Sequence, residues 1–100
     1  MGADVAPMEL EFDPDKDRRN RAKHGISLAM ALHLDWDSLD VVPDLRRPYG
    51  ENHYIGDGII DSRLHCVVYT TRSAVVRIIS LRKANSREGL KYGKDGPPAH

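Results

Sequence analysis

The chain has 100 residues, of which 40% are hydrophobic and 30% charged, and its formal net charge is zero. This length allows one small domain. No apolar run approaches the roughly 18–20 residues of a membrane-spanning helix, and the single cysteine, Cys66, excludes an internal disulfide. Because the N-terminus also lacks a basic segment followed by an apolar one, no signal peptide is expected, and the sequence predicts a cytoplasmic protein.

The zero net charge hides a segregation along the chain. Residues 16–24 carry five cations against one acid, and residues 72–94 carry seven cations against one acid. Residues 35–61 carry seven acids against two cations. If folding brings the two basic segments together, they form a surface for an anionic ligand; alternatively, acidic and basic segments neutralise one another. Charge alone does not separate these two interpretations.

The first predicted elements are a strand and a helix. Residues 1–7 are expected to be disordered, and the alternation of polar and apolar side chains over residues 9–12 predicts a short strand. Asp13 and Pro14 then predict the start of a helix, with Asp13 as its cap. Gly25 is the typical left-handed residue that ends such a helix.

This first helix is unusual because it has almost no apolar side chain. A helix of this kind is poorly stabilised by packing. Its cations Lys16, Arg19 and Lys23 recur at helical spacing and are expected to line one face. Ser27 predicts the cap of a second helix over residues 28–34 that packs on the core.

The remaining predicted elements are four strands and a short helix. Tight links between the later strands indicate antiparallel hairpins, and a short last helix from Asn85 or Ser86 to Tyr92 precedes a frayed tail. The resulting order β-α-α-β-β-β-β-α predicts an α+β domain with an antiparallel sheet, two N-terminal helices and a short C-terminal helix. The strands are predicted over residues 39–42, 53–60, 64–71 and 74–81, and the tail over residues 93–100.

The motifs of several site classes are missing from the sequence. The five histidines show no metal-binding spacing, and one cysteine cannot form a thiolate site. Glycine-rich phosphate loops, nucleophile elbows and dinucleotide fingerprints are also absent. If the protein is an enzyme, we therefore expect no metal and no cofactor, and chemistry carried out by side chains alone.

Lys23 and His24, at the end of the first helix, are the first candidates for chemistry. Lys23 could hold a phosphate while His24 exchanges a proton near neutral pH, or both could simply complement the helix dipole. Arg77 lies within an apolar strand and needs an acidic partner, such as Glu51 or Glu88, unless it faces a cleft that receives a phosphate.

Two further patterns leave alternatives open. In a regular strand, Arg77 and Arg82 point to opposite faces, so they can serve one site only if a bulge intervenes or Arg82 lies beyond the strand. Tyr69 and Tyr92 could stack on a base or could be core aromatics with satisfied hydroxyl groups.

Taken together and in order, these motifs make the chain resemble the BrnT family, the toxin half of a bacterial type II toxin–antitoxin pair. The resemblance extends from about residue 8 to residue 92. Glu88 and Tyr92 follow the last matching string. The matching strings are Glu11-Phe12-Asp13-Pro14, Lys23-His24-Gly25-Ile26-Ser27, Gly50-Glu51, Val67-Val68-Tyr69-Thr70-Thr71-Arg72 and Arg77-Ile78-Ile79-Ser80-Leu81-Arg82-Lys83-Ala84.

The resemblance implies a compact RelE-like domain over residues 8–92 and a metal-independent endoribonuclease that cleaves RNA and inhibits growth. It also implies a BrnA-like antitoxin that masks the toxin. The complex, a dimer or heterotetramer, would bind operator DNA through the antitoxin. The rival hypothesis is a non-catalytic module of the same fold that binds RNA or a protein, and this rival predicts cations that are spread out and paired with acids.

The resemblance also implies roles for individual residues. His24 is expected to transfer a proton, and Glu51 to act as a base or to hold an arginine in place. The chain departs from the family where Asn52 and His53 follow the Gly-Glu pair, because an arginine is common there. Expected to stabilise the phosphate are Lys23, Arg72, Arg77 and Arg82; expected to contact RNA are Arg19, Tyr69, Lys83 and Tyr92.

Overall fold

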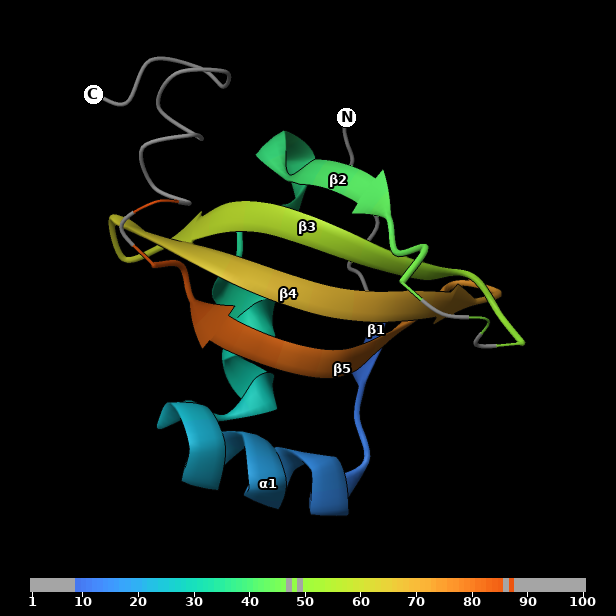
Figure 1. The fold of residues 1–100 in the computed structure, drawn as a ribbon, viewed down its shortest axis with the longest axis horizontal. Coiled ribbons are helices and arrows are strands. Elements are labelled where there is room, and N and C mark those ends of the chain that lie inside the picture. Colours follow the sequence, from blue (N-terminus) through green and yellow to red (C-terminus); the bar gives the residue numbers. More distant parts are fainter. Residues whose placement is uncertain (1–8, 47, 49, 86, 88–100) are drawn as a thin grey trace.

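The computed structural model describes residues 9–46, 48, 50–85 and 87. A five-stranded sheet in the order β1-β5-β4-β3-β2 forms the body of the domain, with α1 along its β5 side and the short helices behind it (Figure 1). The predicted α+β class is confirmed, and the predicted strands lie within two residues of the observed ones. The elements are β1 (Glu9–Glu11), α1 (Pro14–His24), η1 (Leu28–His33), η2 (Trp36–Ser38), β2 (Asp40–Pro43), β3 (His53–Ile60), β4 (Arg63–Arg72) and β5 (Val75–Lys83).

The sheet is mixed, so the prediction of an antiparallel sheet is wrong for one edge. Strands β2 to β5 form antiparallel neighbours, as the hairpin links predict. Strand β1 instead runs parallel to β5, with Glu9 opposite Val75 and Glu11 opposite Arg77. Short-range sequence patterns predict hairpins but give no signal for the pairing of β1 with β5, because these strands lie near opposite ends of the described chain.

The helices differ from the prediction in type. Segment η1 is a 3₁₀ helix, closed by bonds from Met30 N–H to the Ser27 carbonyl (3.1 Å) and from Leu34 N–H to the Ala31 carbonyl (3.2 Å). Two regular N-terminal helices are therefore not formed: the bonds of η1 span three residues and not four, a choice that its six-residue sequence does not decide. Ser27 does act as its cap, accepting from Ala29 N–H at 3.1 Å.

Several predictions fall largely or wholly outside the part of the chain that the structure describes. They are the disordered start over residues 1–7, the tail over residues 93–100 and the C-terminal helix, of which only Arg87 is described, with helical backbone. Within the described residues, no helix has both the length and the apolar character needed to cross a membrane.

The core lies on the face of the sheet that η1 covers. Leu39 packs over Gly56 and Gly58, where a Cβ atom would come within 2.6 Å and 2.5 Å of its side chain. Trp36 packs against the core, and its ring lies edge-on to Tyr69 at 5.2 Å between centroids. The buried cluster consists of Leu28, Ala31, Leu34, Ile60, Val67, Val76, Ile78 and Leu81.

Helix α1 is attached to the sheet by a buried amide instead of an apolar face. Asn20 is the one buried residue of the helix. Its Nδ2 donates to the carbonyls of Leu81 (2.8 Å) and Ile26 (2.9 Å), while its Oδ1 accepts from Leu81 N–H (3.2 Å). Strand β1 pairs only with residues 75–77 of β5, and the bonds from Asn20 satisfy the backbone of Leu81 farther along the same edge. One side chain therefore sets the position of α1 along β5.

The ends of α1 and η1 are also joined by a carboxylate. Oδ1 of Asp17 accepts from Leu28 N–H (2.7 Å) and from the Ser27 hydroxyl (2.9 Å). The Leu28 N–H is the main cause that lowers the pKa of Asp17 below 3.8, with the Ser27 hydroxyl and the Arg21 charge adding to it. At Asp13 the predicted capping bond is absent, whereas Gly25 ends the helix in the left-handed conformation, as expected.

We expect Asp17→Asn to lower the free energy of unfolding at pH 7 by about 1–2 kcal/mol, because it weakens two hydrogen bonds to an ionised acceptor. A lowered folded-state pKa stabilises the protein above the unfolded-state value and loses that effect as the pH falls through the folded-state value. The difference between wild type and variant in urea denaturation should therefore shrink below pH 3.8. A difference of equal size at pH 7 and pH 3 would contradict this assignment.

Candidate functional site

A bulge in β5 decides where the arginines of this strand point. Val68 pairs with Ser80 and Tyr69 pairs with Ile78, so Ile79 is an extra residue. The inward residues of β5 are consequently 76, 78 and 81, all in the core cluster. Arg77, opposite Thr70, and Arg82, opposite Cys66, thus lie on the same face, because their partners are four residues apart in β4.

This shared face is the one that η1 and η2 leave uncovered, turned toward the viewer in Figure 1. Arg77 is held there by Glu11 of β1, with 2.6 Å between Nη1 and Oε2. Among the described residues, the partner of Arg77 is therefore Glu11 and not Glu51, because β1 pairs in parallel beside it. Glu88, the other suggested partner, lies outside the described residues. We call this surface the open face.

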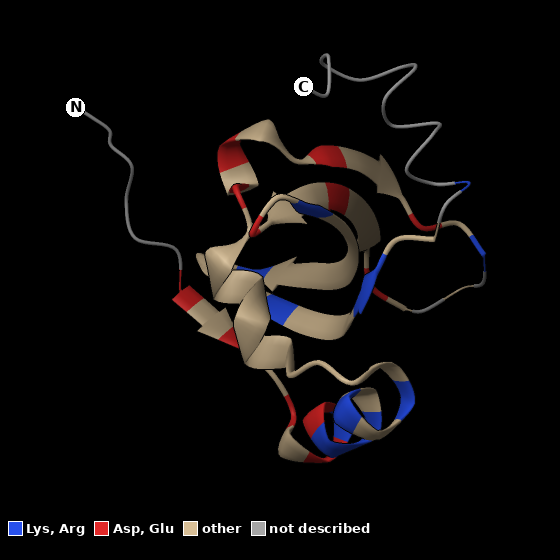
Figure 2. Cartoon of the chain, turned by 90° about the vertical axis from the view of Figure 1, so that its left-hand side faces the viewer, with Lys and Arg blue, Asp and Glu red and all other residues tan. Residues whose placement is uncertain are grey.

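A groove between α1 and the bulge of β5 gathers the cations of the helix. It has a volume of about 300 Å³. Figure 2 shows the concentration of Lys and Arg on α1, away from the acidic residues of η2 and β2. We call it the basic groove; its lining residues are Lys16, Arg19, Asn20, Lys23, His24, Ile79 and Ser80.

The ion pairs of α1 divide its cations into two groups. Arg18 pairs with Asp15 and Arg21 pairs with Asp17, within the helix itself. Lys16, Arg19 and Lys23, the stripe expected from their spacing, form no ion pair with any residue that the structure describes. The unpaired stripe is the part of the helix that lines the groove, so it is available to an anionic ligand.

His24 lies at the end of this groove, half-buried. Burial lowers its pKa below 6.5, and the positive charges of Lys23 and Arg82 lower it further. The imidazole is therefore mainly neutral at pH 7 and can accept a proton. The effect of Arg82 on His24 also shows that the end of β5 approaches the end of α1, which brings together two of the sequence-predicted motifs.

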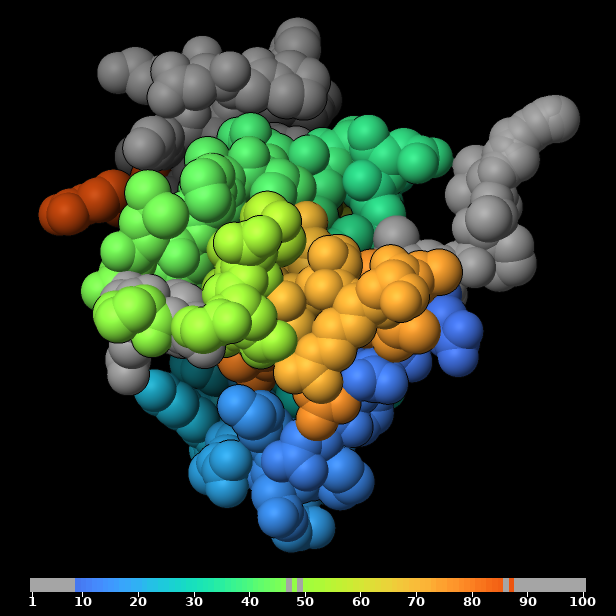
Figure 3. All heavy atoms as spheres, turned by 90° about the vertical axis from the view of Figure 1, so that its right-hand side faces the viewer, coloured from blue at the N-terminus to red at the C-terminus, as the bar shows by residue number. Residues whose placement is uncertain are grey.

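A second cluster lies at the other end of the sheet, where the start of β3 meets the turn after β4 (Figure 3). Oε2 of Glu51 lies 3.0 Å from Nε2 of His53, and its Oε1 accepts from Nη2 of Arg72 at 3.0 Å. The hydrogen bonds from His53 and then Arg72 are the main causes that lower the pKa of Glu51. Glu51 is therefore ionised at neutral pH.

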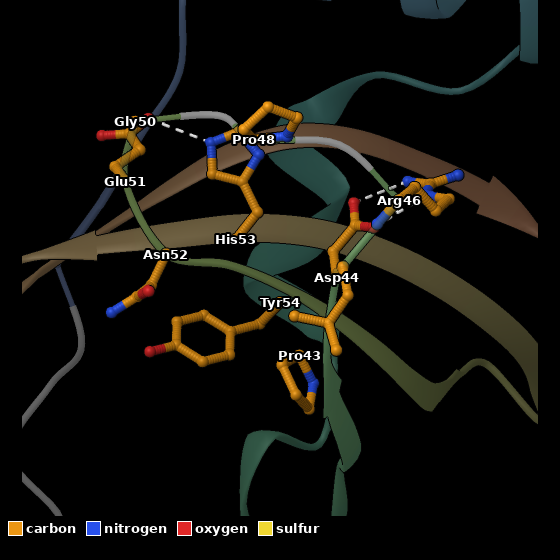
Figure 4. Close-up of a pocket in the computed structure, with 10 residues that line it drawn as sticks. Pro43, Asp44, Arg46, Pro48, Gly50, Glu51, Asn52, His53 and Tyr54 are labelled. Atoms are coloured by element: carbon orange, nitrogen blue, oxygen red, sulfur yellow. Dashed lines mark hydrogen bonds and ion pairs between the residues drawn. The ribbon is translucent and has the colours of Figure 1, made fainter.

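A hollow of about 810 Å³ adjoins this cluster (Figure 4). Its described lining runs over residues 43–46, 48 and 50–54. His53 and Tyr54 enter it from the start of β3, and Asp44 is held on its wall by a two-pronged ion pair with Arg46, at 2.8 Å for each contact.

Comparison with protein families identifies the chain. A family model described as "Ribonuclease toxin, BrnT, of type II toxin-antitoxin system" matches residues 12–88. The chain belongs to the BrnT family. No curated protein sequence matches it. The family is one of ribonuclease toxins, so this BrnT chain is of a class that acts on RNA and has an antitoxin as its partner.

The structure separates the sequence-predicted residues of this BrnT chain into groups. Lys23 and His24 line the basic groove with Arg19, and the charge of Arg82 acts on His24 there. Glu51 and Arg72 meet at the other cluster. Arg77 lies on the open face, between its register partners Glu11 of β1 and Thr70 of β4.

Three residues predicted to contact RNA lie elsewhere or outside the description. Tyr69 packs between Trp36 and Tyr54 on the core side, and burial raises its pKa, so its hydroxyl group stays protonated. Lys83 pairs with His65 on that same side. Tyr92 lies outside the described residues.

Two residues of this BrnT chain have parts in these sites that the sequence did not reveal. Asn20 holds α1 in place, but an asparagine within a polar helix carries no local signal for such a role. His53 contacts Glu51, and the departure expected at Asn52 and His53, after the Gly-Glu pair, was the available signal.

Proposed function

We propose that the chain is a metal-independent endoribonuclease toxin that binds the RNA backbone along the basic groove. The observation that carries the proposal is the stripe of Lys16, Arg19 and Lys23, which form no ion pair with a described residue. The stripe lies beside a histidine whose lowered pKa favours the neutral form at pH 7. Unpaired cations that line a groove suit a polyanion, whose binding depends mainly on contacts to phosphate. Metal independence is part of this proposal because the five histidines show no metal-binding spacing in the sequence and the chain has a single cysteine.

The chemistry requires that the 2′-hydroxyl group lose a proton, that charge on the phosphorus be stabilised, and that the 5′-oxygen be protonated as it leaves. In our proposal His24 accepts the proton of the 2′-hydroxyl group, and Lys23 and Arg82 stabilise the charge on the phosphate. The 5′-oxygen takes a proton from solvent water as its bond to phosphorus breaks. Arg77 and Arg72, farther along the open face, contact the strand on one side of the cleaved bond. In the absence of RNA, Arg72 is paired with Glu51.

The proposal extends to the setting of the reaction. A BrnA-like antitoxin neutralises the toxin in the cytoplasm by covering the basic groove. The two proteins form a dimer or heterotetramer that reaches operator DNA through the antitoxin only. These statements rest on membership of the family, whose description names a toxin–antitoxin system.

Expression in a bacterial host tests the proposal. Induced wild type is expected to arrest growth and to produce new RNA 5′ ends, whereas Lys23→Ala is expected to permit growth, because it removes the groove cation next to His24. Lys83→Ala, on the other side of the sheet, is the charge-matched control and should remain toxic. Normal growth and intact RNA on induction of wild type would refute the enzymatic proposal.

The second candidate is a non-catalytic module of the same fold. Its support is that Arg72 and Arg77 are already paired, with Glu51 and Glu11 respectively. On this account RNA binds but is not cut. RNA that is retained by wild type without any new ends would favour the module over the enzyme.

A further inference from the structure

One carboxylate at the end of the open face joins a histidine and an arginine side chain. One oxygen of the Glu51 carboxylate contacts Nε2 of His53 and the other contacts Nη2 of Arg72, each at 3.0 Å. The Glu51 side chain is 36% exposed and that of Arg72 is 58% exposed. Solvent, and hence a ligand, can reach the contact.

His53 and Arg72, which contact the Glu51 carboxylate, lie in regular strands, whereas Glu51 does not. His53 is the first residue of β3 and Arg72 the last of β4, and both strands pair along their length. Glu51 precedes β3, in the segment between β2 and β3. The Thr70 hydroxyl donates to the Asn52 carbonyl at 2.6 Å and so anchors the chain directly after Glu51. The donors can keep their positions when the carboxylate turns away.

We propose that His53 and Arg72 form a second phosphate subsite and that Glu51 occupies it while RNA is absent. A phosphodiester presents two oxygens in the same forked arrangement as a carboxylate, and a guanidinium group binds either one. The ligand is a backbone phosphate of the RNA strand whose other phosphates lie in the basic groove. The inference therefore rests on the proposed function and assigns Glu51 to gating the subsite.

The path between subsite and groove is continuous in the fold. Strand β1 ends at Glu11, beside Arg77, and α1 begins at Pro14, so the first turn of the helix lies toward the end of the sheet that carries the subsite. The stripe then leads along the helix, from residue 16 to residue 23, toward Arg82. The register partners of Arg77 and Arg82 are four residues apart in β4, a distance of about 13 Å along that strand. An RNA segment of several nucleotides is long enough to contact both arginines.

The sign of the Glu51 effect on RNA affinity tests the subsite. We would measure binding of a 2′-O-methyl RNA oligonucleotide, which lacks the nucleophile and is not cleaved, by fluorescence anisotropy. Glu51→Gln is expected to tighten binding about threefold to tenfold, since it removes a competing charge next to the phosphate. Arg72→Ala is expected to weaken it, with a salt-dependence slope lower by about 0.7 for one lost contact to single-stranded RNA.

Matched variants separate this effect from a change in net charge. Asp37→Asn removes the same charge from η2 and should leave affinity within about 1.5-fold, because the charge is exposed and screened. In an Arg72→Ala background, Glu51→Gln should tighten binding less than in the wild-type background, since one of the two donors is gone.

The outcomes distinguish the subsite from the proposed function. If Lys23→Ala weakens binding but Glu51→Gln leaves affinity unchanged, the subsite is refuted and the basic groove stands. Loss of cleavage in Glu51→Gln without tighter binding would instead assign Glu51 as the base, and would overturn the gating role. If wild type neither binds nor cleaves RNA, the proposed function fails and the subsite with it.

Discussion

Replacing His24 with alanine is expected to slow RNA cleavage by about 10²- to 10⁴-fold, the usual contribution of a positioned proton-transfer group. His24 lies in the basic groove next to Lys23, and burial together with the charges of Lys23 and Arg82 keeps its pKa below 6.5. The neutral imidazole is the form that accepts a proton from a 2′-hydroxyl group. Single-turnover cleavage of a short RNA by purified protein measures the effect.

The pH dependence of cleavage gives a second test of His24. A lowered pKa means that the active neutral form is present above that value and is lost as the pH falls through it, so the wild-type rate should decline below pH 6.5. Because His33 is exposed on η1 and outside the groove, His33→Ala serves as the control and should keep both the rate and this profile. A His24→Ala protein that cleaves at the wild-type rate would rule out the role.

Replacing Asn20 with alanine is expected to lower the free energy of unfolding by about 2–4 kcal/mol. The substitution removes three hydrogen bonds and leaves the N–H and carbonyl groups of Leu81 without this partner; an unsatisfied buried polar group costs about 1–3 kcal/mol. Since α1 has no apolar face to hold it, loss of the amide should also displace the basic stripe. Urea denaturation measures the first effect and RNA affinity the second.

A neighbouring substitution controls for the helix itself. Arg19→Ala, one residue before Asn20 and exposed, should change stability by no more than about 0.5 kcal/mol while it weakens RNA binding. If Asn20→Ala is as stable as Arg19→Ala, then α1 is held by something other than this amide, and our description of its attachment is wrong.

Local patterns sufficed for much of the fold. The Pro14 start and Gly25 stop of α1, and the hairpins that join β3, β4 and β5, follow from residue types and short spacings. The parallel pairing of β1 with β5 could not be predicted in this way, because it depends on contacts between residues more than 60 positions apart. Six residues of η1 can form either kind of helix, and their local sequence does not choose between them.

The candidate site was predictable where it depended on helical periodicity. The spacing of Lys16, Arg19 and Lys23 indicated a common face, and that face lines the groove. The β5 bulge at Ile79 was not predictable, since nothing in an apolar strand marks which residue is extra. For the same reason, the sequence did not decide whether Arg77 and Arg82 share a face, and only the strand register shows that they do.

Folding preserves the charge segregation seen in the sequence. The acids of residues 35–44 lie in and around η2 and β2, near the β2 edge of the sheet. The cations Lys16, Arg19 and Lys23 lie on α1, near β5 at the opposite edge (Figures 1 and 2). Among the described residues, the acids of residues 35–44 and the cations of α1 therefore do not neutralise one another as whole surfaces. Individual pairs, such as Arg72 with Glu51, do form, so the alternative interpretation holds only locally.

The central claim is that this BrnT-family chain cleaves RNA with side chains of the basic groove. Its most direct test is incubation of purified protein with a single-stranded RNA in excess EDTA, followed by mapping of product ends. We predict discrete products ending in a 2′,3′-cyclic phosphate and a 5′-hydroxyl group with wild type, and intact RNA with Lys23→Ala. Intact RNA with folded wild type, or equal cleavage by folded Lys23→Ala, would contradict the account.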